Sequence, residues 1–153
     1  MRIVSVFSAA SDAVTSIVKS IEPAASHVYL QSKGPGHYVA WIYARYEPGQ
    51  AHCNDLYVGG FTYSAVIGCP YLVAFGGADI SPRFRGKGLG SLFHDLRLKD
   101  ATESGFAAAI CTVREGNAPQ ERIMDKFGWR KANSFVKKNR IAIWTKELNE
   151  RLG

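Results

Sequence analysis

The chain has 153 residues, of which 46% are hydrophobic and 21% are charged, and its formal net charge at pH 7 is +6. This length and composition are typical of a globular chain with a sizeable core, so we expect a single domain over residues 1–153. No apolar run approaches the length of a membrane-spanning helix, and the N-terminal apolar stretch is too short for a signal-peptide core. We therefore expect no membrane partner.

Cysteine and histidine spacing gives no sign of a metal site. The cysteines are odd in number and none is paired at a ligand spacing, which favours reduced thiols and a cytoplasmic location. The cysteines are Cys53, Cys69 and Cys111, and the histidines are His27, His37, His52 and His94. The positive net charge favours binding of an anionic partner, but it does not distinguish a small anionic ligand from nucleic acid.

The first half of the chain is predicted to consist of strands around one helix. Residues 2–8 have the pattern of a strand, and residues 13–21 that of a helix whose apolar side chains recur at helical spacing. Strands are expected near 28–31 and over 37–46, where β-branched and aromatic residues are frequent. Over 56–80 we expect two or three strands, because glycine and proline interruptions hide their boundaries.

The second half alternates helices and strands. A helix is predicted over 91–103, with Leu92, Phe93 and Leu96 facing inward. It is followed by a buried strand, a second helix and a final strand pair, over 106–114, 118–127, 129–136 and 140–148. This order of elements predicts an α/β domain built on a mixed sheet.

A glycine-rich run joins the strand-like stretch 71–80 to the helix that follows it. It consists of Arg85-Gly86-Lys87-Gly88-Leu89-Gly90. Its glycines have free access to positive φ, and backbone N–H groups in such a turn can point at an anion beside a helix N-terminus. A Walker loop is excluded because Gly88 follows Lys87, and the dinucleotide fingerprint is excluded because Ser91 stands where its third glycine would be.

Two landmarks resemble the GNAT superfamily of N-acetyltransferases. Arg85, Gly88 and Gly90 fill the pattern Arg/Gln-x-x-Gly-x-Gly/Ala of its acetyl-CoA pyrophosphate loop. About thirty residues on, a strand is followed by Asn117 and by a helix that ends at Gly128 and an aromatic residue, in the order that the family shows. Glycine after a helix also makes a sensible C-cap.

The resemblance implies a fold, a cofactor and the residues that hold it. The fold would be a single-domain α/β GNAT-like fold, with a central mixed sheet flanked by helices and a split between the strands around 71–80 and 106–114. The cofactor would be acetyl-CoA as acetyl donor. The residues expected to bind it are Ala78, Asp79, Ile80, Arg85, Gly86, Lys87, Gly88, Leu89, Gly90, Ser91 and Asn117. Arg85 would order the turn or contact phosphate, and the backbone at 78–80 would pair with the pantetheine arm.

The reaction that the resemblance implies is direct transfer of acetyl to a primary amine of a small molecule or protein. The position of the family's usual tyrosine acid holds Met124, whose thioether donates no proton, and the acidic position five residues before Asn117 holds Thr112. Candidate bases are Asp79, Glu115 and, after them, His94. The alternative is a GNAT-fold interaction module that binds acyl-CoA with weak or no catalysis.

Other partners are less well supported. Nucleic acid, for instance in an acetyltransferase of aminoacyl-tRNA, is suggested only by the net charge, because aromatic and basic residues do not interleave as in an RNA-binding sheet. A homodimer is left open. The tyrosines that precede the loop suit strands in general, and Tyr43 and Tyr63 are the candidates for lining an acceptor pocket.

Overall fold

The structure is a computed structural model that describes residues 4–34, 37–46, 55–136 and 139–148. The chain divides into two compact units, each made of two segments. Unit 1 consists of Met1–Thr62 and Gly77–Phe93, and unit 2 of Tyr63–Gly76 and His94–Gly153.

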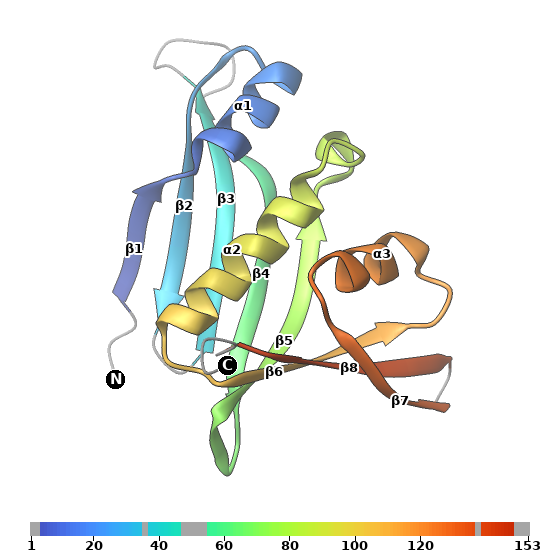
Figure 1. Cartoon of the computed structure of the whole chain (residues 1–153). Helices are drawn as coiled ribbons and strands as arrows, with labels where there is room; N and C mark the ends of the chain where they lie inside the picture. Colours follow the sequence, from blue (N-terminus) through green and yellow to red (C-terminus); the bar gives the residue numbers. More distant parts are fainter. Residues whose placement is uncertain (1–3, 35–36, 47–54, 137–138, 149–153) are drawn as a thin grey trace. The chain divides into compact units, whose positions relative to one another are not determined.

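Unit 1 contains the N-terminal strands and the glycine-rich loop (Figure 1). Its elements are β1 Val4–Ala9, α1 Asp12–Ile21, β2 Ala25–Gly34, β3 His37–Tyr46, the first part of β4 Leu56–Val66, the last part of β5 Cys69–Ile80, a 3-10 helix Pro82–Phe84 and the start of α2 Leu89–Glu103. β1 pairs with β2, and β2 with β3, both antiparallel. α1 packs against β2 through a face that buries Val14 and Val18 completely.

β2 is longer than the predicted strand near 28–31. It has a partner on both sides, since Tyr29 lies opposite Ala9 of β1 and opposite Tyr43 of β3. Two ladders of backbone hydrogen bonds extend the strand beyond its most apolar residues, which is a tertiary effect that local sequence does not carry. α1 starts as predicted, because the Ser11 side chain accepts a hydrogen bond from the Val14 N–H at 3.4 Å.

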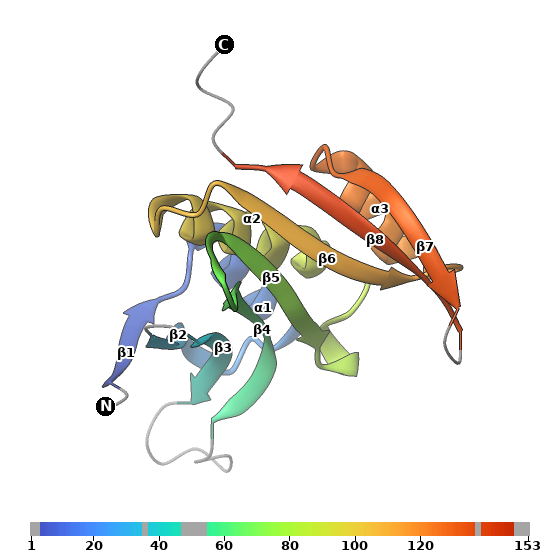
Figure 2. The ribbon, with the colours of Figure 1, turned by 90° about the horizontal axis from the view of Figure 1, so that it is seen from below.

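Unit 2 contains the C-terminal strands (Figure 2). Besides the rest of β4, β5 and α2, its elements are β6 Ala108–Arg114, α3 Ala118–Lys126, β7 Arg130–Val136 and β8 Arg140–Glu147. β5 and β6 pair in parallel, whereas β8 is antiparallel to β6 on one side and to β7 on the other. The final strand pair and the helix before it lie where the sequence predicts them.

The stripe of α2 that is buried differs from the predicted one. Phe93 is buried as expected, but Leu92 is half-buried, and unit 2 buries His94 and Arg97 instead, at 3% and 2% exposure. The Arg97 guanidinium lies 4.3 Å from the centre of the Phe75 ring and donates to the Gly76 carbonyl at 3.1 Å. Burial lowers the pKa of Arg97 to about 10, so it remains charged at neutral pH. A paired polar residue therefore takes a place that hydrophobic periodicity assigns to leucine.

The fold class is α/β with a mixed sheet, as predicted. The strand order is β1-β2-β3-β4-β5-β6-β8-β7. The pairing of β5 with β6 runs from Leu72↔Ala108 to Phe75↔Cys111, while β5 itself continues to Ile80 and β6 to Arg114. The end of β5 belongs to unit 1 and β6 to unit 2, so the expected split between these strands stays a prediction. That residues 1–153 form a single domain stays a prediction.

The described residues contain neither a membrane-spanning helix nor a metal-binding cluster. In the described ranges, no helix combines the length and the apolar character needed to cross a membrane. Within the same residues, no group of three or more histidine, cysteine, aspartate or glutamate side chains is arranged to hold a metal ion.

Candidate functional site

The end of β5 is fixed closely against β4 in unit 1. The Ser81 N–H donates to the Val58 carbonyl at 2.8 Å. A Cβ atom added to Gly59 would lie 2.5 Å from the Asp79 carbonyl oxygen and 2.7 Å from the Phe93 ring, so only glycine allows this approach of the two strands. The strand end that carries Asp79 and Ile80 is thus held rigidly before the chain turns into the loop.

The glycine-rich loop has the left-handed backbone that the sequence predicts. Gly86 has φ +76° and Gly88 has φ +88°, a region that costs an L-residue about 1–2 kcal/mol. A Cβ atom at either glycine would meet no atom of the described residues within 4 Å. The glycines are therefore required by the backbone conformation, and the space beside the loop is open. Just before it, Phe84 is fully buried and anchors the 3-10 helix.

The first backbone N–H groups of α2 have no acceptor in the helix. The first intrahelical bond at this end is donated by the Leu92 N–H to the Gly88 carbonyl, at 3.3 Å. The N–H groups of Leu89, Gly90 and Ser91 precede it, as at every helix start. Among the residues that the structure describes, no side chain accepts from these three groups. The loop and the first turn thus present unused donors beside the positive end of the helix dipole.

Arg85 holds the loop to the strand that precedes it. Its Nε donates to the Ile80 carbonyl at 2.8 Å, and its Nη2 lies 3.7 Å from the Asp79 carboxylate. Of the two roles expected for Arg85, ordering the turn is the one that its contacts serve. The ion pair itself is exposed and contributes little, because exposed pairs are worth about 0–1 kcal/mol.

Asp79 presents an accessible carboxylate next to a tyrosine. Its side chain is 63% exposed. Tyr57 of β4 is half-buried, and burial first, and then the neighbouring Asp79 charge, raise the pKa of the Tyr57 hydroxyl. Sequence reasoning missed Tyr57, because its meeting with Asp79 depends on the register of β4 against β5.

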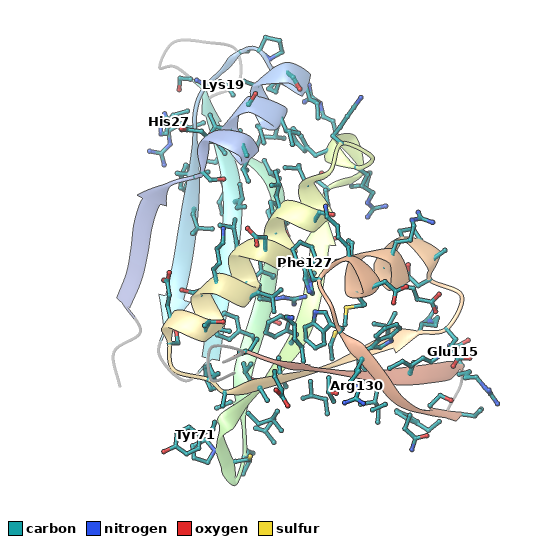
Figure 3. All side chains as sticks on the ribbon, viewed as in Figure 1. Lys19, His27, Tyr71, Glu115, Phe127 and Arg130 are labelled. Carbon is teal, nitrogen blue, oxygen red and sulfur yellow. The ribbon has the colours of Figure 1, made fainter. Side chains whose placement is uncertain are left out.

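Glu115 and Asn117 belong to unit 2, where each has a contact within its own unit. The Glu115 carboxylate pairs with Lys131 Nζ at 3.1 Å and with Arg140 Nε at 3.7 Å (Glu115 is labelled in Figure 3). The Asn117 side chain accepts from the Gln120 N–H at 3.4 Å and caps α3. Both contacts stabilise the start of α3 and the strand pair. Their roles in catalysis and cofactor binding stay predictions.

His94, the last of the candidate bases, lies buried in an aromatic core of unit 2. Its Nε2 accepts from the Trp129 Nε1–H at 2.8 Å, and its ring contacts Phe75, Phe127 and Trp129. Burial first, and then the Arg97 charge, lower the pKa of His94 to about 4. A neutral, buried imidazole whose Nε2 accepts a core hydrogen bond is a structural residue.

Met124 and Tyr63 are also core residues of unit 2. Met124 is fully buried in α3, with its sulfur 3.7 Å from the Gln120 amide nitrogen. Tyr63 is 1% exposed, and its hydroxyl donates to Asp100, so it does not line a pocket. Tyr43 of unit 1 differs from Tyr63, because its half-buried ring lies between the rings of Tyr29 and Tyr57.

Comparisons with known proteins support the fold through structure and not through sequence. No protein-family model and no curated protein sequence matches the chain. The ribosomal-protein-S18-alanine N-acetyltransferase from Escherichia coli is 13% identical, with a TM-score of 0.59 over 98% of this chain and 99% of that one. A Salmonella typhimurium protein solved with its cofactor acetyl-CoA is 15% identical, with a TM-score of 0.60 over 97% and 96%.

A GNAT-family acetyltransferase from Bacillus anthracis is 19% identical, with a TM-score of 0.56 over 72% of this chain and 67% of that one. At such low identity, structural likeness speaks for the architecture alone. The predicted landmarks and the structural neighbours agree on that architecture. The chain has the fold of the GNAT-family acetyltransferases.

Proposed function

We propose that this protein is an N-acetyltransferase that transfers acetyl from acetyl-CoA directly to a primary amine of a small molecule or a protein. The observation that carries the proposal is the loop between β5 and α2. It combines two glycines at positive φ, open space at both of their Cβ positions and unused N–H groups at the start of a helix. Acetyl-CoA is proposed as the ligand because the loop fits the pattern of an acetyl-CoA pyrophosphate loop and a structural neighbour was solved with acetyl-CoA.

The residues present fit a pyrophosphate in the loop. In the proposal, the backbone N–H groups over 86–91 donate to its oxygens, and the exposed Lys87 adds positive charge. The backbone of Ala78–Ile80 pairs with the pantetheine arm, and Asn117 contributes a further contact. Acetyl-CoA supplies the thioester whose acetyl group is transferred. The backbone N–H near Ile80 then donates to the carbonyl oxygen, where negative charge develops.

Proton transfer from the amine is assigned to Asp79. The acceptor amine must lose a proton to attack, and Asp79 offers an exposed carboxylate with one cation at 3.7 Å. Glu115 is the weaker candidate, because two cations already neutralise its carboxylate. Since Met124 donates no proton, the leaving thiolate takes its proton from water in this proposal.

The first test is a thermal-shift titration with acetyl-CoA. A ligand at a hundred times its Kd stabilises the folded state by about 2.7 kcal/mol, so saturating acetyl-CoA should raise the Tm clearly. The second test is release of free thiol in the presence of an amine panel. The panel includes a peptide with an N-terminal alanine, because the Escherichia coli neighbour is named for such an acceptor.

The two tests separate the main proposal from its alternative. A Tm increase with thiol release that depends on the amine supports the transferase. Binding without release against the whole panel favours an acyl-CoA-binding module that is catalytically weak or inactive, for which the burial of Met124 at the usual acid position is the supporting observation. No Tm change at saturating acetyl-CoA contradicts both.

A further inference from the structure

In the described part of unit 1, a tyrosine lies near a carboxylate at two places, and the first of these pairs holds a cation. The Tyr29 hydroxyl donates to Asp55, which also pairs with Arg45 Nε at 3.0 Å. The Arg45 guanidinium lies over the Tyr29 ring, 4.8 Å from its centre. The cation is thus bound by a negative charge and by the face of an aromatic ring together, a combination that is stronger than either alone.

Tyr57 and Asp79 also offer a ring and a carboxylate, on the adjacent strands β4 and β5. There the Ser81 N–H donates to the Val58 carbonyl, and Gly59 lies against the Asp79 backbone. Within the described residues, no lysine or arginine lies over the Tyr57 ring. Arg85 comes no closer than 3.7 Å to the Asp79 carboxylate, and its Nε already donates to the Ile80 carbonyl. A carboxylate offers about four lone-pair sites, so Asp79 keeps capacity for a further donor.

A row of aromatic rings joins the two pairs. The ring centres of Tyr29 and Tyr43 are 5.6 Å apart, and those of Tyr43 and Tyr57 are 5.7 Å apart. The rings come from β2, β3 and β4, and those of Tyr43 and Tyr57 are only half-buried. A ligand with a positive charge at one end and a flat apolar part would fit against these rings, because ring faces bind both cations and flat apolar groups.

We propose that Asp79, Tyr57 and Tyr43 form a binding site for a primary ammonium ion that carries an apolar, planar body. The ammonium group lies between the Asp79 carboxylate and the Tyr57 ring, and the body lies against Tyr57 and Tyr43. This inference rests on the proposed function, because the bound amine is then the acetyl acceptor and Asp79 is already beside the proton that it must lose. It narrows the acceptor class to compact aromatic or similarly flat amines.

The test compares 2-phenylethylamine with 2-phenylethanol, which has the same body and no charge. Binding of each is measured by calorimetry with CoA present, so that no transfer occurs. The wild-type protein should bind the amine about tenfold more tightly than the alcohol, since the carboxylate and ring face act on the cation alone. Asp79→Asn should abolish this preference. Equal binding of the two compounds, or a preference that survives Asp79→Asn, contradicts the proposal.

Substitutions of the ring test its contribution separately. Tyr57→Leu removes the ring and should weaken binding of both compounds, whereas Tyr57→Phe keeps the ring and should retain most of the preference. Tyr71→Leu is the control, because Tyr71 is a 69% exposed tyrosine of unit 2 that plays no part in the site. Unchanged binding in Tyr57→Leu contradicts the proposal.

The outcomes distinguish the inference from the proposed function. The effect of acetyl-CoA on the Tm is measured separately for each variant. A Tm increase without any preference for the amine refutes the ammonium site and leaves the acetyltransferase proposal intact. A preference for the amine without any response to acetyl-CoA refutes the acetyltransferase proposal and leaves an ammonium site.

Discussion

The first turn of α2 and its buried middle satisfy their polar groups in opposite ways. Its first turn, in unit 1, follows a loop with positive-φ glycines and leaves the N–H groups of Leu89, Gly90 and Ser91 without a protein acceptor in the described residues. Its later turns, in unit 2, bury His94 and Arg97, each with a protein partner. Buried polar groups that are paired internally belong to the architecture, whereas exposed donors grouped on a fixed backbone are available to a ligand.

The N-terminus of α3 differs from that of α2 because a side chain of the protein caps it. It also follows a strand and a positive-φ glycine, Gly116, but the Asn117 side chain accepts from the Gln120 N–H. α2 has no such side-chain cap in the part of the chain that the structure describes. A cap normally adds about 1 kcal/mol, so its absence at α2 is a cost that a bound anion can offset.

The largest effect is expected in the buried region, as pH falls. His94 has a folded-state pKa of about 4 against an ordinary value of 6.5, so the unfolded chain binds its proton first. The contribution of His94 to stability is complete above pH 6.5 and is lost between pH 6.5 and 4, to a total of about 3 kcal/mol. Denaturant unfolding at a series of pH values measures this loss.

His94→Gln is the matched variant for that measurement. Glutamine offers an oxygen to the Trp129 Nε1–H but has no charge to gain in this range. The variant should lack the part of the pH dependence that His94 causes, while the acidic residues contribute equally to both proteins. Identical pH profiles would show that His94 is not the buried, neutral group described here.

An intermediate effect is expected at the loop. Gly88→Ala puts a Cβ on a residue at φ +88°, which costs about 1–2 kcal/mol or shifts the loop to another conformation. The Kd for acetyl-CoA should rise about tenfold. Gly68→Ala, on the β4–β5 turn, is the control, because Gly68 has φ +81° and an equally empty Cβ position. Both variants should lose similar stability, and only the first should lose affinity.

The loop would not differ from other turns in binding if Gly88→Ala and Gly68→Ala had the same Kd for acetyl-CoA. Equal, small changes in Kd would mean that the left-handed backbone at 86–88 is a folding feature of the turn and has no part in binding.

The smallest effect is expected at the cap of α3. Asn117→Ala should reduce stability by about 1 kcal/mol, because the Gln120 N–H loses its acceptor. Asn117→Asp keeps an acceptor and should restore that stability, but it removes the amide donor and adds a negative charge. Calorimetry of acetyl-CoA binding then tests the cofactor role. If Asn117 contacts the cofactor directly, Asn117→Asp should be about as stable as the wild-type protein and should bind acetyl-CoA more weakly. Unchanged affinity would limit Asn117 to capping.

Local features of the structure were predictable where backbone chemistry decides them. Gly86 and Gly88 have the positive φ expected of them, and Asn117 starts a helix that ends before Gly128, as predicted. Turns, caps and helix ends depend on a few adjacent residues, so the sequence carries their signal directly.

Features that depend on contacts between distant residues were not predictable. The burial of His94 and Arg97 was not predicted from the sequence, because it depends on their pairing with the Trp129 N–H and the Gly76 carbonyl, which are distant in sequence. The meeting of Tyr57 with Asp79 depends on the register of two strands. The burial of Tyr63 depends on Asp100 and on ring contacts with Phe75 and Phe106.

If the open N–H groups after β5 bind the pyrophosphate of acetyl-CoA, their amide signals must respond to it. The most direct measurement is an amide NMR titration of the ¹⁵N-labelled protein with acetyl-CoA, alongside acetyl-pantetheine, which lacks the pyrophosphate. We predict that the amide signals of Gly86, Gly88 and Gly90 shift with acetyl-CoA and stay in place with acetyl-pantetheine. Loop signals that do not move with acetyl-CoA, or that move equally with both compounds, would contradict the account.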